Sequence, residues 1–399
     1  MTAILGRAGM LVPAPRITRV RLENYQAFQS VEFDPVTPLC VLLGPNGSGK
    51  STVLDALRFL SQVVTEGLPV AVDARGGLSE IRSRDSSGPV LVAVAAEFEG
   101  VRFDYRVAVD ERDDGLVFAE ETLAAGPVGG SIRPVLEFHG GSGAVHGAAA
   151  EPEQVSLTSP DVSAVAVLGQ LSEHEEIAGF REFVSRWHLL NPDAERMRTG
   201  SRGKATRRLS RAGDNLGQVV QYLQDEQPET MAKIIESLRR YVPGLETVQP
   251  QRLPDGRYIV RLKDVNFADP IYPENISDGT LKLLAQLVAL RDAFPVLLLE
   301  EPENQVHPRL PYLLAEDIRS ATEHAQVVVA THSPYFVDAL RPDEVWMLFR
   351  NDNGRAEAKR AADLPRLMAM VEAGGALGDL WTEGYFGLGD PLTRSGRPT

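Results

Sequence analysis

The sequence is poor in cysteine and has neither a long apolar run nor an excess of positive charge. Cys40 is the one cysteine among 399 residues, so the chain cannot form an internal disulfide. It stands in an apolar run, which favours a buried core thiol over a reactive one. No stretch of about 18 apolar residues is present, so no membrane span is expected. Together these absences predict a cytoplasmic location.

Acidic residues outnumber basic ones, with 55 Asp and Glu against 41 Lys and Arg and a net charge of −14. This balance argues against a surface that coats nucleic acid non-specifically, although it allows a local basic groove. Residues 202–211, RGKATRRLSR, could contact nucleic-acid phosphates or an acidic partner, or they could form a solvated loop. Residues 1–15 are too short and too weakly apolar for a signal peptide, which favours a flexible leader.

The first third of the chain predicts strands around one amphipathic helix. Residues 17–25 alternate as a half-buried strand does, and the apolar run 39–43 predicts a strand buried on both faces. After a glycine-rich turn, residues 51–60 keep helical apolar spacing. Residues 89–109 predict a hairpin that turns at Glu99 and Gly100. Residues 124–154, rich in Gly, Ala, Pro and Ser, predict a loose connection.

The middle third predicts mainly helices. One is expected over 162–188, a second begins after Asp214 or Asn215 as its cap, and a third covers 228–241. Two strands around 257–263 are expected to return the chain to a sheet.

The last third alternates between helices and apolar strands. Helices are expected at 277–293 and 308–322, and buried strands at 295–301 and 326–333. This alternation predicts a mostly parallel sheet with helices on its faces. The core of the sheet therefore draws on both ends of the chain, and a helical insertion lies between them.

Residues 44–51, GPNGSGKS, match the pattern G-x-x-x-x-G-K-[ST] in full. Glycines in such a loop let backbone N–H groups surround phosphates, Lys50 reaches the β- and γ-phosphates, and the Ser51 hydroxyl binds Mg²⁺. The helix that begins here directs the positive end of its dipole at the anion. A buried strand before the loop and an amphipathic helix after it make a chance glycine turn a poor alternative. The segment predicts ATP and Mg²⁺ as cofactors, with nucleotide contacts from Gly44, Pro45, Asn46, Gly47, Ser48, Gly49, Lys50, Ser51 and Thr52.

Hydrolysis also needs a carboxylate at the metal and a group that orients water. VLLLEE at 296–301 places two glutamates at the end of an apolar strand, where ligands of open α/β sheets bind. We expect Glu300 to hold Mg²⁺ and Glu301 to orient the attacking water; the alternative is a solvated pair at a strand end. His332 in ATHSP ends the next apolar strand and could contact the γ-phosphate or the water, or it could be purely structural.

Taken in order, GPNGSGKST, ISDGTLKLLAQL, LLLEEPENQVHP and ATHSP resemble the ATP-binding-cassette head of the RecF/SMC-like ATPases. More narrowly, they resemble the stand-alone bacterial RecF-like group of AAA-type ATPases, and the resemblance covers nearly the whole chain. It implies an α/β P-loop NTPase whose ABC-type head has a mostly parallel core sheet, an antiparallel β-subdomain and a helical insertion. We expect a leader at 1–15, an N-terminal lobe with the P-loop at 16–140, the mainly helical insertion with return strands at 141–265, and a C-terminal lobe at 266–399.

The resemblance also implies a homodimer that forms on ATP binding. In the family, the segment that matches Ser277, Asp278 and Gly279 is the signature loop, which contacts the γ-phosphate held by a second subunit. Ser277 and Gly279 are therefore expected to contact ATP in trans. Without the family, Ser277 or Asp278 would be only the N-cap of the helix at 280–292, and both interpretations stay open. The segment 303–307 matches the loop that crosses the dimer interface.

The sequence departs from the family pattern at three points. Glu300 stands where the family often has aspartate, and Asp278 stands at the second glycine position of the signature. The glutamine that usually couples the metal to the γ-phosphate cannot be placed, because Gln26 and Gln62 are poor candidates.

Two biological roles fit this sequence. The first is an ATP-driven dimeric clamp in DNA repair or other DNA transactions, which the resemblance and residues 202–211 favour and the net charge of −14 opposes. The second is a sensor or switch that gates a separately encoded effector, such as a nuclease in phage defence or a toxin of a toxin–antitoxin pair. No sustained heptads lie between Ser51 and Ser277, which distinguishes the chain from SMC proteins with their long coiled coils. Too few residues follow His332 for an appended nuclease, and the expected absence of an effector domain favours the second role. The signature disfavours a transporter ATPase.

Overall fold

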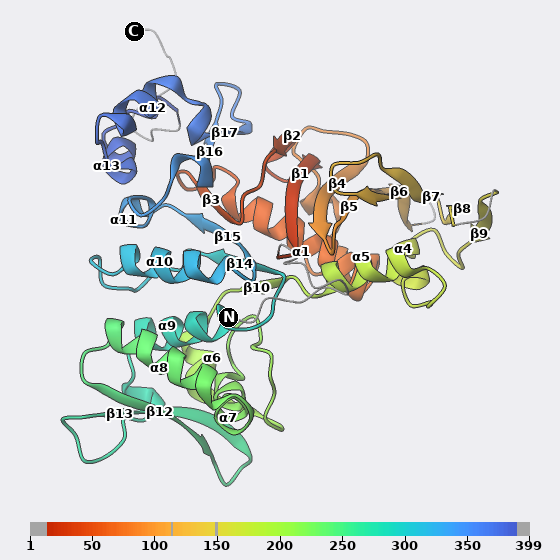
Figure 1. The fold of residues 1–399 in the computed structure, drawn as a ribbon. Coiled ribbons are helices and arrows are strands. Elements are labelled where there is room, and N and C mark those ends of the chain that lie inside the picture. Colours follow the sequence, from red (N-terminus) through yellow and green to blue (C-terminus); the bar gives the residue numbers. More distant parts are fainter. Residues whose placement is uncertain (1–13, 113–114, 148–150, 389–399) are drawn as a thin grey trace.

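The computed structural model describes residues 14–112, 115–147 and 151–388. The leader predicted for residues 1–15 therefore lies outside the described residues, except for its last two positions. Three sheets organise the chain: a mostly parallel sheet, a large antiparallel sheet beside it, and a small sheet from the middle third of the sequence (Figure 1). The predicted α/β class, with a parallel core sheet and an antiparallel β-subdomain, is confirmed.

The mostly parallel sheet joins segments from distant parts of the chain. Its strand order is β10 (His188–Leu190), β14 (Val296–Glu300), β15 (Gln326–Thr331), β3 (Leu39–Leu43), β16 (Val345–Arg350) and β17 (Ala356–Arg360), of which only β17 runs antiparallel to its neighbour. β3 is apolar throughout, and β14 and β15 are apolar except at their ends, because both faces of the sheet are covered. Cys40 and Leu42 pack into one core and Val41 into another. Burial raises the pKa of the Cys40 thiol to about 12, so this cysteine is the inert core thiol that the sequence predicts.

The antiparallel sheet supplies most of the N-terminal lobe. Its order is β2 (Phe28–Phe33), β1 (Arg16–Tyr25), β4 (Val90–Phe98), β5 (Val101–Arg112), β6 (Gly115–Pro127), β7 (Arg133–His139), β8 (Ser142–Val145) and β9 (Glu153–Ser156). β4 and β5 form the predicted hairpin with its turn at Glu99 and Gly100. The loose connection predicted for 124–154 is wrong for most of its described residues, because strands β6 to β9 pair there; residues 148–150 lie outside the described residues. Cross-strand pairing, and not local apolar pattern, defines strands of this composition.

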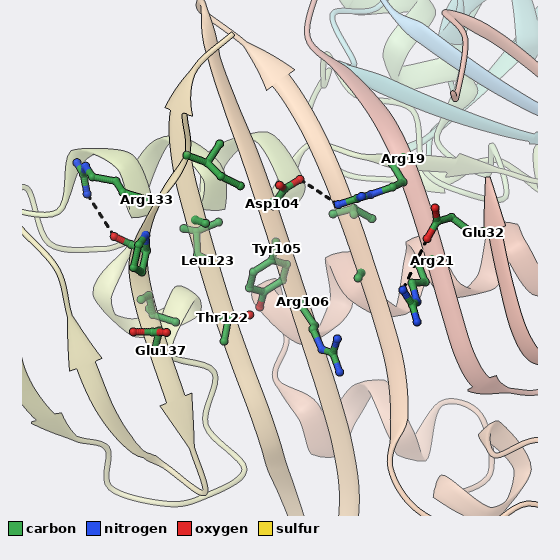
Figure 2. A pocket seen from close by; sticks show the side chains of 16 residues that line it. Arg19, Arg21, Glu32, Asp104, Tyr105, Arg106, Thr122, Leu123, Arg133 and Glu137 are labelled. Carbon is green, nitrogen blue, oxygen red and sulfur yellow. Dashed lines mark hydrogen bonds and ion pairs between the residues drawn. The ribbon is translucent and has the colours of Figure 1, made fainter. Parts of the chain in front are cut away.

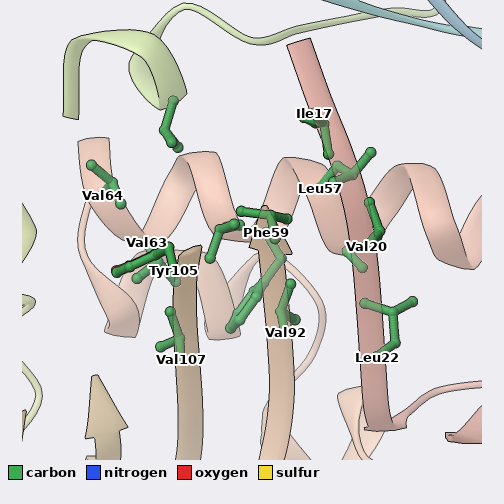
Figure 3. Close-up of a cluster of buried hydrophobic side chains, with 14 of the residues drawn as sticks. Ile17, Val20, Leu22, Leu57, Phe59, Val63, Val64, Val92, Tyr105 and Val107 are labelled. Atoms are coloured by element: carbon green, nitrogen blue, oxygen red, sulfur yellow. The ribbon is translucent and has the colours of Figure 1, made fainter. Parts of the chain in front are cut away.

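The helix after the glycine-rich turn, α1 (Lys50–Thr65), packs against both large sheets. Figure 3 shows Leu57, Phe59 and Val63 of α1 beside Val20 and Val92 of the antiparallel sheet. The short helices α2 (Leu68–Asp73) and α3 (Leu78–Ile81) follow and add to the same core. Burial on two sides holds α1, and therefore the turn at its start, in a fixed position relative to the strands.

The single helix predicted for 162–188 is wrong. The structure has α4 (Ala164–Leu168) and α5 (Glu175–Ser185), and His188 already begins β10. Gly169 separates the two helices, and a Cβ at this position would lie 2.9 Å from the Cβ of Arg181 on α5. The buried carboxylate of Glu121 on β6 accepts the backbone N–H of Ala164 at 2.6 Å. The helix start is therefore fixed by a side chain from another element.

The middle of the chain forms a small unit of helices on a sheet. It contains α6 (Ala194–Thr199), β11 (Ser201–Arg202), α7 (Leu216–Glu226), α8 (Pro228–Tyr241), β12 (Leu245–Arg252) and β13 (Arg257–Asp264). α7 begins after Asn215 and α8 covers the predicted range. The two strands predicted around 257–263 do return the chain to a sheet, but it is a separate sheet of order β11-β13-β12 and not the core sheet. Figure 1 places this unit against α9, on the far side of it from the core sheet.

The last part alternates between helix and strand as predicted. A 3₁₀ turn, η1 (Pro273–Asn275), leads to α9 (Asp278–Ala289) before β14, and α10 (Pro311–Ala321) precedes β15. Beyond β15 lie α11 (Pro334–Val337), η2 (Pro342–Glu344), η3 (Ala361–Asp363), α12 (Pro365–Glu372) and α13 (Leu377–Thr382). None of the helices in the described part of the chain has the length and apolar character needed to cross a membrane.

Candidate active site

The predicted site residues follow strands that end at one edge of the parallel sheet. Leu43 at the end of β3 pairs with Thr331 of β15, and Ala330 of β15 pairs with Glu300 at the end of β14. The loop at 44–49 and His332 each follow one of these strand ends. Crevices at the carboxyl ends of parallel strands are where open α/β sheets bind ligands. The sheet therefore gathers segments that are far apart in the sequence.

The glycine-rich loop fits its surroundings only without side chains at two positions. A Cβ at Gly44 would lie 2.2 Å from the carbonyl oxygen of Leu348, and one at Gly49 would lie 2.6 Å from Cζ of Phe28. Gly49 also has a φ of 104°, in the left-handed region that favours glycine. α1 begins with no side-chain cap and no acidic residue in its first turn. Its first N–H groups and the positive end of its dipole are therefore available to an anion.

Lys50 lies folded over this loop. Its Nζ donates to the carbonyl oxygens of Gly44 at 2.7 Å and Pro45 at 3.1 Å. Burial lowers the pKa of Lys50, and the nearby carboxylates, Glu301 first, oppose that shift. On the other side of the loop, Nε of Arg350 donates to the carbonyl oxygen of Gly47 at 2.8 Å. We did not predict this contact, although Arg350 ends an apolar strand next to β3.

Ser51 and Glu300 are in direct contact. The Ser51 hydroxyl donates to Oε1 of Glu300 at 2.5 Å across 249 positions of sequence. A hydroxyl and a carboxylate side by side are the hard oxygen donors that Mg²⁺ uses when it also takes phosphate and water oxygens. No group of three or more His, Cys, Asp and Glu side chains suited to a metal was found in the described ranges. The donor set thus fits an ion shared with a phosphate better than a cage made by protein alone.

Glu301 and His332 form the second contact pair. Nδ1 of His332 lies 2.7 Å from Oε1 of Glu301, and both side chains are partly exposed. Glu301 has a φ of 44°, which is uncommon for a residue with a side chain. Its backbone N–H donates to the carbonyl oxygen of Ala330 at 2.8 Å, so the residue continues the pairing of β14 with β15 while its side chain turns toward the histidine. A carboxylate can in this way orient an imidazole ring.

Three buried polar residues that we did not single out fix the segment after Glu301. The Thr331 hydroxyl donates to Oε1 of Glu303, a side chain 8% exposed. Burial raises the pKa of Glu303, and the bond from Thr331 opposes that shift. Nε2 of Gln286 on α9 donates to the carbonyl oxygen of Pro302 at 2.8 Å. In the sequence, only Gln286, a polar residue within the apolar run of α9, could have indicated these buried hydrogen bonds.

Ser277 and Gly279 lie away from the glycine-rich loop. Ser277 is the N-cap of α9 and its hydroxyl accepts the N–H of Thr280 at 3.2 Å. A Cβ at Gly279 would lie 2.3 Å from the carbonyl oxygen of Gln305. Among the hydrogen bonds of the described residues, none joins Ser277 or Gly279 to residues 44–51. Within one chain, Ser277 acts as a cap, and Gly279 allows α9 to approach the segment after β14.

Arg198 of α6 holds the chain that leads into α9. Its guanidinium donates to the carbonyl oxygens of Pro273 at 3.2 Å and Ile276 at 2.9 Å, and it pairs with the Asp278 carboxylate. That pairing is the largest cause that lowers the pKa of Asp278. The departure from glycine at position 278 therefore has a structural reason, because the carboxylate ties α9 to the middle unit. No local pattern identified Arg198.

Neither candidate glutamine belongs to the site. Gln62 is 8% exposed and accepts from Nη1 of Arg75 at 2.9 Å, while Nε2 of Gln26 donates to Asp55 at 3.4 Å. β14 has β15 on one side and β10 on the other. β10 pairs in parallel with β14, and Asn191 follows its end, close to Glu300 in the sheet register. Asn191 was missed because the segment before it was predicted as helix.

The close approach of Gly279 to Gln305 can be tested by substitution. Gly279→Ala is expected to lower the melting temperature of the nucleotide-free protein, because overpacking costs about 1–3 kcal/mol. That cost exceeds the roughly 1 kcal/mol that alanine gains over glycine in a helix. Ser277→Ala is the matched variant, and loss of its cap should cost about 1 kcal/mol. If Gly279→Ala melts at or above the wild-type temperature, the contact with Gln305 is not restrictive.

A protein-family model described as "AAA domain, putative AbiEii toxin, Type IV TA system" matches residues 39–138 and 152–338. These ranges contain every residue predicted for the site. Among curated proteins, the Retron Ec83 probable ATPase of Escherichia coli is 20% identical over 391 aligned residues, covering 84% of this chain and 71% of that protein. The DNA replication and repair protein RecF of Chlorobium luteolum is 41% identical, but over only 44 residues, which are 11% of this chain and 12% of RecF.

Solved structures with a similar fold include heads of SMC proteins. An SmcHead bound to the C-winged helix domain of ScpA matches with a TM-score of 0.54 and 15% identity, covering 86% of this chain and 97% of that one. The Smc head domain with an extended coiled coil from Pyrococcus furiosus, bound to the C-terminal domain of ScpA, has a TM-score of 0.54 and 13% identity over 90% of this chain and all of that one. At such identities the likeness concerns the fold.

Proposed function

Because the chain belongs to the family described as "AAA domain, putative AbiEii toxin, Type IV TA system" and is an ABC-type ATPase with an SMC-head fold, we propose that it is a Mg²⁺-dependent ATPase switch for a separately encoded effector. One observation carries the catalytic part of this proposal. The Ser51–Glu300 and Glu301–His332 pairs lie at the same sheet edge as the glycine-rich loop.

The proposed reaction is attack of water on the γ-phosphorus of ATP. The water oxygen forms a bond to the γ-phosphorus while Glu301 takes a proton from that water. The bond between the γ-phosphorus and the β–γ bridging oxygen breaks, and ADP leaves with its electron pair. Lys50 and the N–H groups at the start of α1 stabilise charge on the phosphates. His332, held by Glu301, is placed to contact the γ-phosphate. Ser51 and Glu300 would hold Mg²⁺, which would supply charge neutralisation to the phosphates.

The site is proposed to be completed by a second copy of the chain. Ser277 and Gly279 make no hydrogen bond to the loop of their own chain, and the start of α9 combines a hydroxyl with helical N–H groups, which suits an anion. In this proposal the two residues contact the ATP held by the partner, so ATP joins the subunits and hydrolysis lets them separate. The segment 303–307 then lies at the interface.

The switch role is supported by the family and by the retron relative. The family description names a toxin system, and a relative that aligns over most of this chain is named the probable ATPase of a retron. For this chain we propose that the ATP-bound and ATP-free states differ in affinity for an effector encoded by a neighbouring gene. A clamp acting on DNA is the second candidate, favoured by the basic segment 202–211 and the short match to RecF.

One experiment separates the two roles. The ATPase rate is measured with single-stranded and duplex DNA over a salt series, and with the purified product of the neighbouring gene. Binding to DNA phosphates must weaken as salt rises, because counterions are released. Stimulation by the neighbouring protein alone supports the switch, and stimulation by DNA alone supports the clamp. If the enzyme turns over equally in all mixtures, neither role is correct.

The metal role of Glu300 gives a separate prediction. Glu300→Gln keeps the hydrogen bond to Ser51 but removes the negative charge, so the Mg²⁺ concentration for half-maximal hydrolysis is expected to rise roughly tenfold, as for the loss of one charged contact. A Mg²⁺ titration of the ATPase rate measures this shift. An unchanged titration curve would show that Glu300 does not hold the metal.

A further inference from the structure

A second pocket lies on the flank of α1, away from the glycine-rich loop. It has a volume of about 330 Å³ and lies between α1, β10 and the end of the basic segment 202–211. Arg58 and Ser61 enter it from α1, Trp187 and His188 from the start of β10, and Arg211 from the basic segment. None of these residues takes part in the proposed hydrolysis.

Two residues that line this pocket, Trp187 and His188, each carry a buried ring nitrogen without a hydrogen-bond partner among the described residues. Trp187 is 7% exposed, and its indole Nε1 is buried without a hydrogen-bond partner in the described part of the chain. Nε2 of His188, whose ring stacks on Phe294, is also buried and unpartnered. Buried polar groups are normally paired, so the unpartnered Trp187 N–H beside the pocket is an exception.

Two guanidinium groups at the pocket have no carboxylate partner. Within the ranges that the structure describes, neither Arg58 nor Arg211 forms an ion pair, whereas Arg207 of the same segment pairs with Asp292 at 3.4 Å. Burial is the first cause that lowers the pKa of Arg58 and the charges of Arg211 and Arg75 are the next, while Asp55 and Glu66 oppose the shift. Glu66 also lines the pocket but lies beyond ion-pair distance of either arginine. Like charges held together at a half-buried site favour a bound anion.

In another arginine-lined hollow of the molecule, the arginines do have carboxylate partners. Figure 2 shows a hollow of about 480 Å³ on the antiparallel sheet, where Arg19 faces Asp104 and Arg21 faces Glu32. Arg106 pairs with Glu120 at 3.2 Å. Neighbouring carboxylates therefore compensate the arginines of that hollow, and it offers an anion no uncompensated charge. The pocket at α1 differs from that hollow because, in the part of the chain that the structure describes, neither Arg58 nor Arg211 is within ion-pair distance of a carboxylate.

We propose that the pocket bounded by Arg58, Trp187 and Arg211 is a second phosphate-binding site, separate from the glycine-rich loop. The two guanidinium groups bind phosphate oxygens, and the Trp187 indole N–H donates to the same group. The phosphate belongs either to a free nucleotide or to a nucleic-acid strand, which share this chemistry. Arg58 and Ser61 lie on α1, and the first turn of the same helix carries Lys50 and Ser51. A ligand bound in the pocket would therefore contact the helix that begins at the ATP site.

The test compares an Arg58→Gln, Arg211→Gln double variant, which removes two positive charges, with Arg366→Gln, which removes one from an exposed position on α12. Inorganic phosphate and thymidine monophosphate are titrated by calorimetry, and a labelled oligo-dT strand by fluorescence anisotropy, all without ATP. The double variant is expected to bind the recognised probe at least about tenfold more weakly than Arg366→Gln. Trp187→Phe, which keeps the ring but loses the N–H, is expected to weaken binding severalfold.

The three probes distinguish the source of the phosphate. Binding of the monophosphate but not of the strand assigns a nucleotide, and binding of the strand with a salt dependence that the double variant reduces assigns nucleic acid. Equal binding of every probe by the double variant and Arg366→Gln overturns the proposal, as does an absence of binding to all three probes. Binding of a fluorescent ATP analogue by the double variant shows that the protein is folded. Because these titrations require no hydrolysis, they stand apart from the proposed function.

Discussion

Glu301→Gln is expected to lower the rate of ATP hydrolysis by a factor of about 10² to 10⁴, the usual contribution of a general base. Glutamine has the shape of glutamate and can still accept the hydrogen bond from Nδ1 of His332, so the geometry at the ends of β14 and β15 should persist. It cannot take a proton from water. ATP binding should therefore remain near the wild-type level while turnover stops, and the ATP-bound dimer should accumulate.

Two measurements check this variant. A phosphate-release assay gives turnover, and size-exclusion chromatography with light scattering gives the mass with and without Mg²⁺-ATP. Glu372→Gln, at the exposed end of α12, is the matched control and should behave as wild type. Turnover within tenfold of wild type would place the base elsewhere. A Glu301→Gln protein that binds ATP but stays monomeric would contradict the trans role of Ser277 and Gly279.

Lys50→Ala is expected to weaken ATP binding by roughly 100-fold or more and to abolish measurable turnover. The variant loses charge-assisted bonds to two phosphates, each of which contributes about 1.5–3 kcal/mol. It also loses the two bonds from Nζ to the carbonyl oxygens of Gly44 and Pro45, which hold the loop together in this structure. The nucleotide-free loop should therefore become more mobile.

Calorimetry with Mg²⁺ and a slowly hydrolysed ATP analogue measures the loss of affinity. Lys359→Ala removes an exposed positive charge from β17 and serves as the control for net charge. If Lys50→Ala binds the analogue as tightly as Lys359→Ala does, the loop at 44–51 is not the nucleotide site. A normal melting temperature for both variants would show that the fold is intact.

Lys50→Ala and Glu301→Gln should also act oppositely on an effector. If the ATP-bound dimer is the state that the effector recognises, Glu301→Gln holds the switch in one position and Lys50→Ala in the other. Their comparison in a binding assay with the neighbouring gene product connects the chemistry at β14 to the proposed role.

Short sequence patterns sufficed for the central features of the fold and the site. The loop at 44–51, the apolar strands β3, β14 and β15, and the range of α8 were predicted because each depends on residues that are neighbours in the chain. The pairing of strands from both ends of the chain also followed, since parallel strands joined by helices have few arrangements. The strands between 124 and 154 were missed because small residues form strands only when partners are present.

By itself, the sequence determined that a phosphate-binding loop, two glutamates and a histidine each follow a buried strand. Only the tertiary structure decided which side chains meet: Ser51 with Glu300, Glu301 with His332, and Gly279 with the backbone of Gln305. It also showed that Arg58 and Arg211 border one pocket with an unsatisfied indole N–H. The physical reason is that local periodicity specifies which face of an element is buried, whereas contacts across long sequence separations depend on how α1 and the strands pack together.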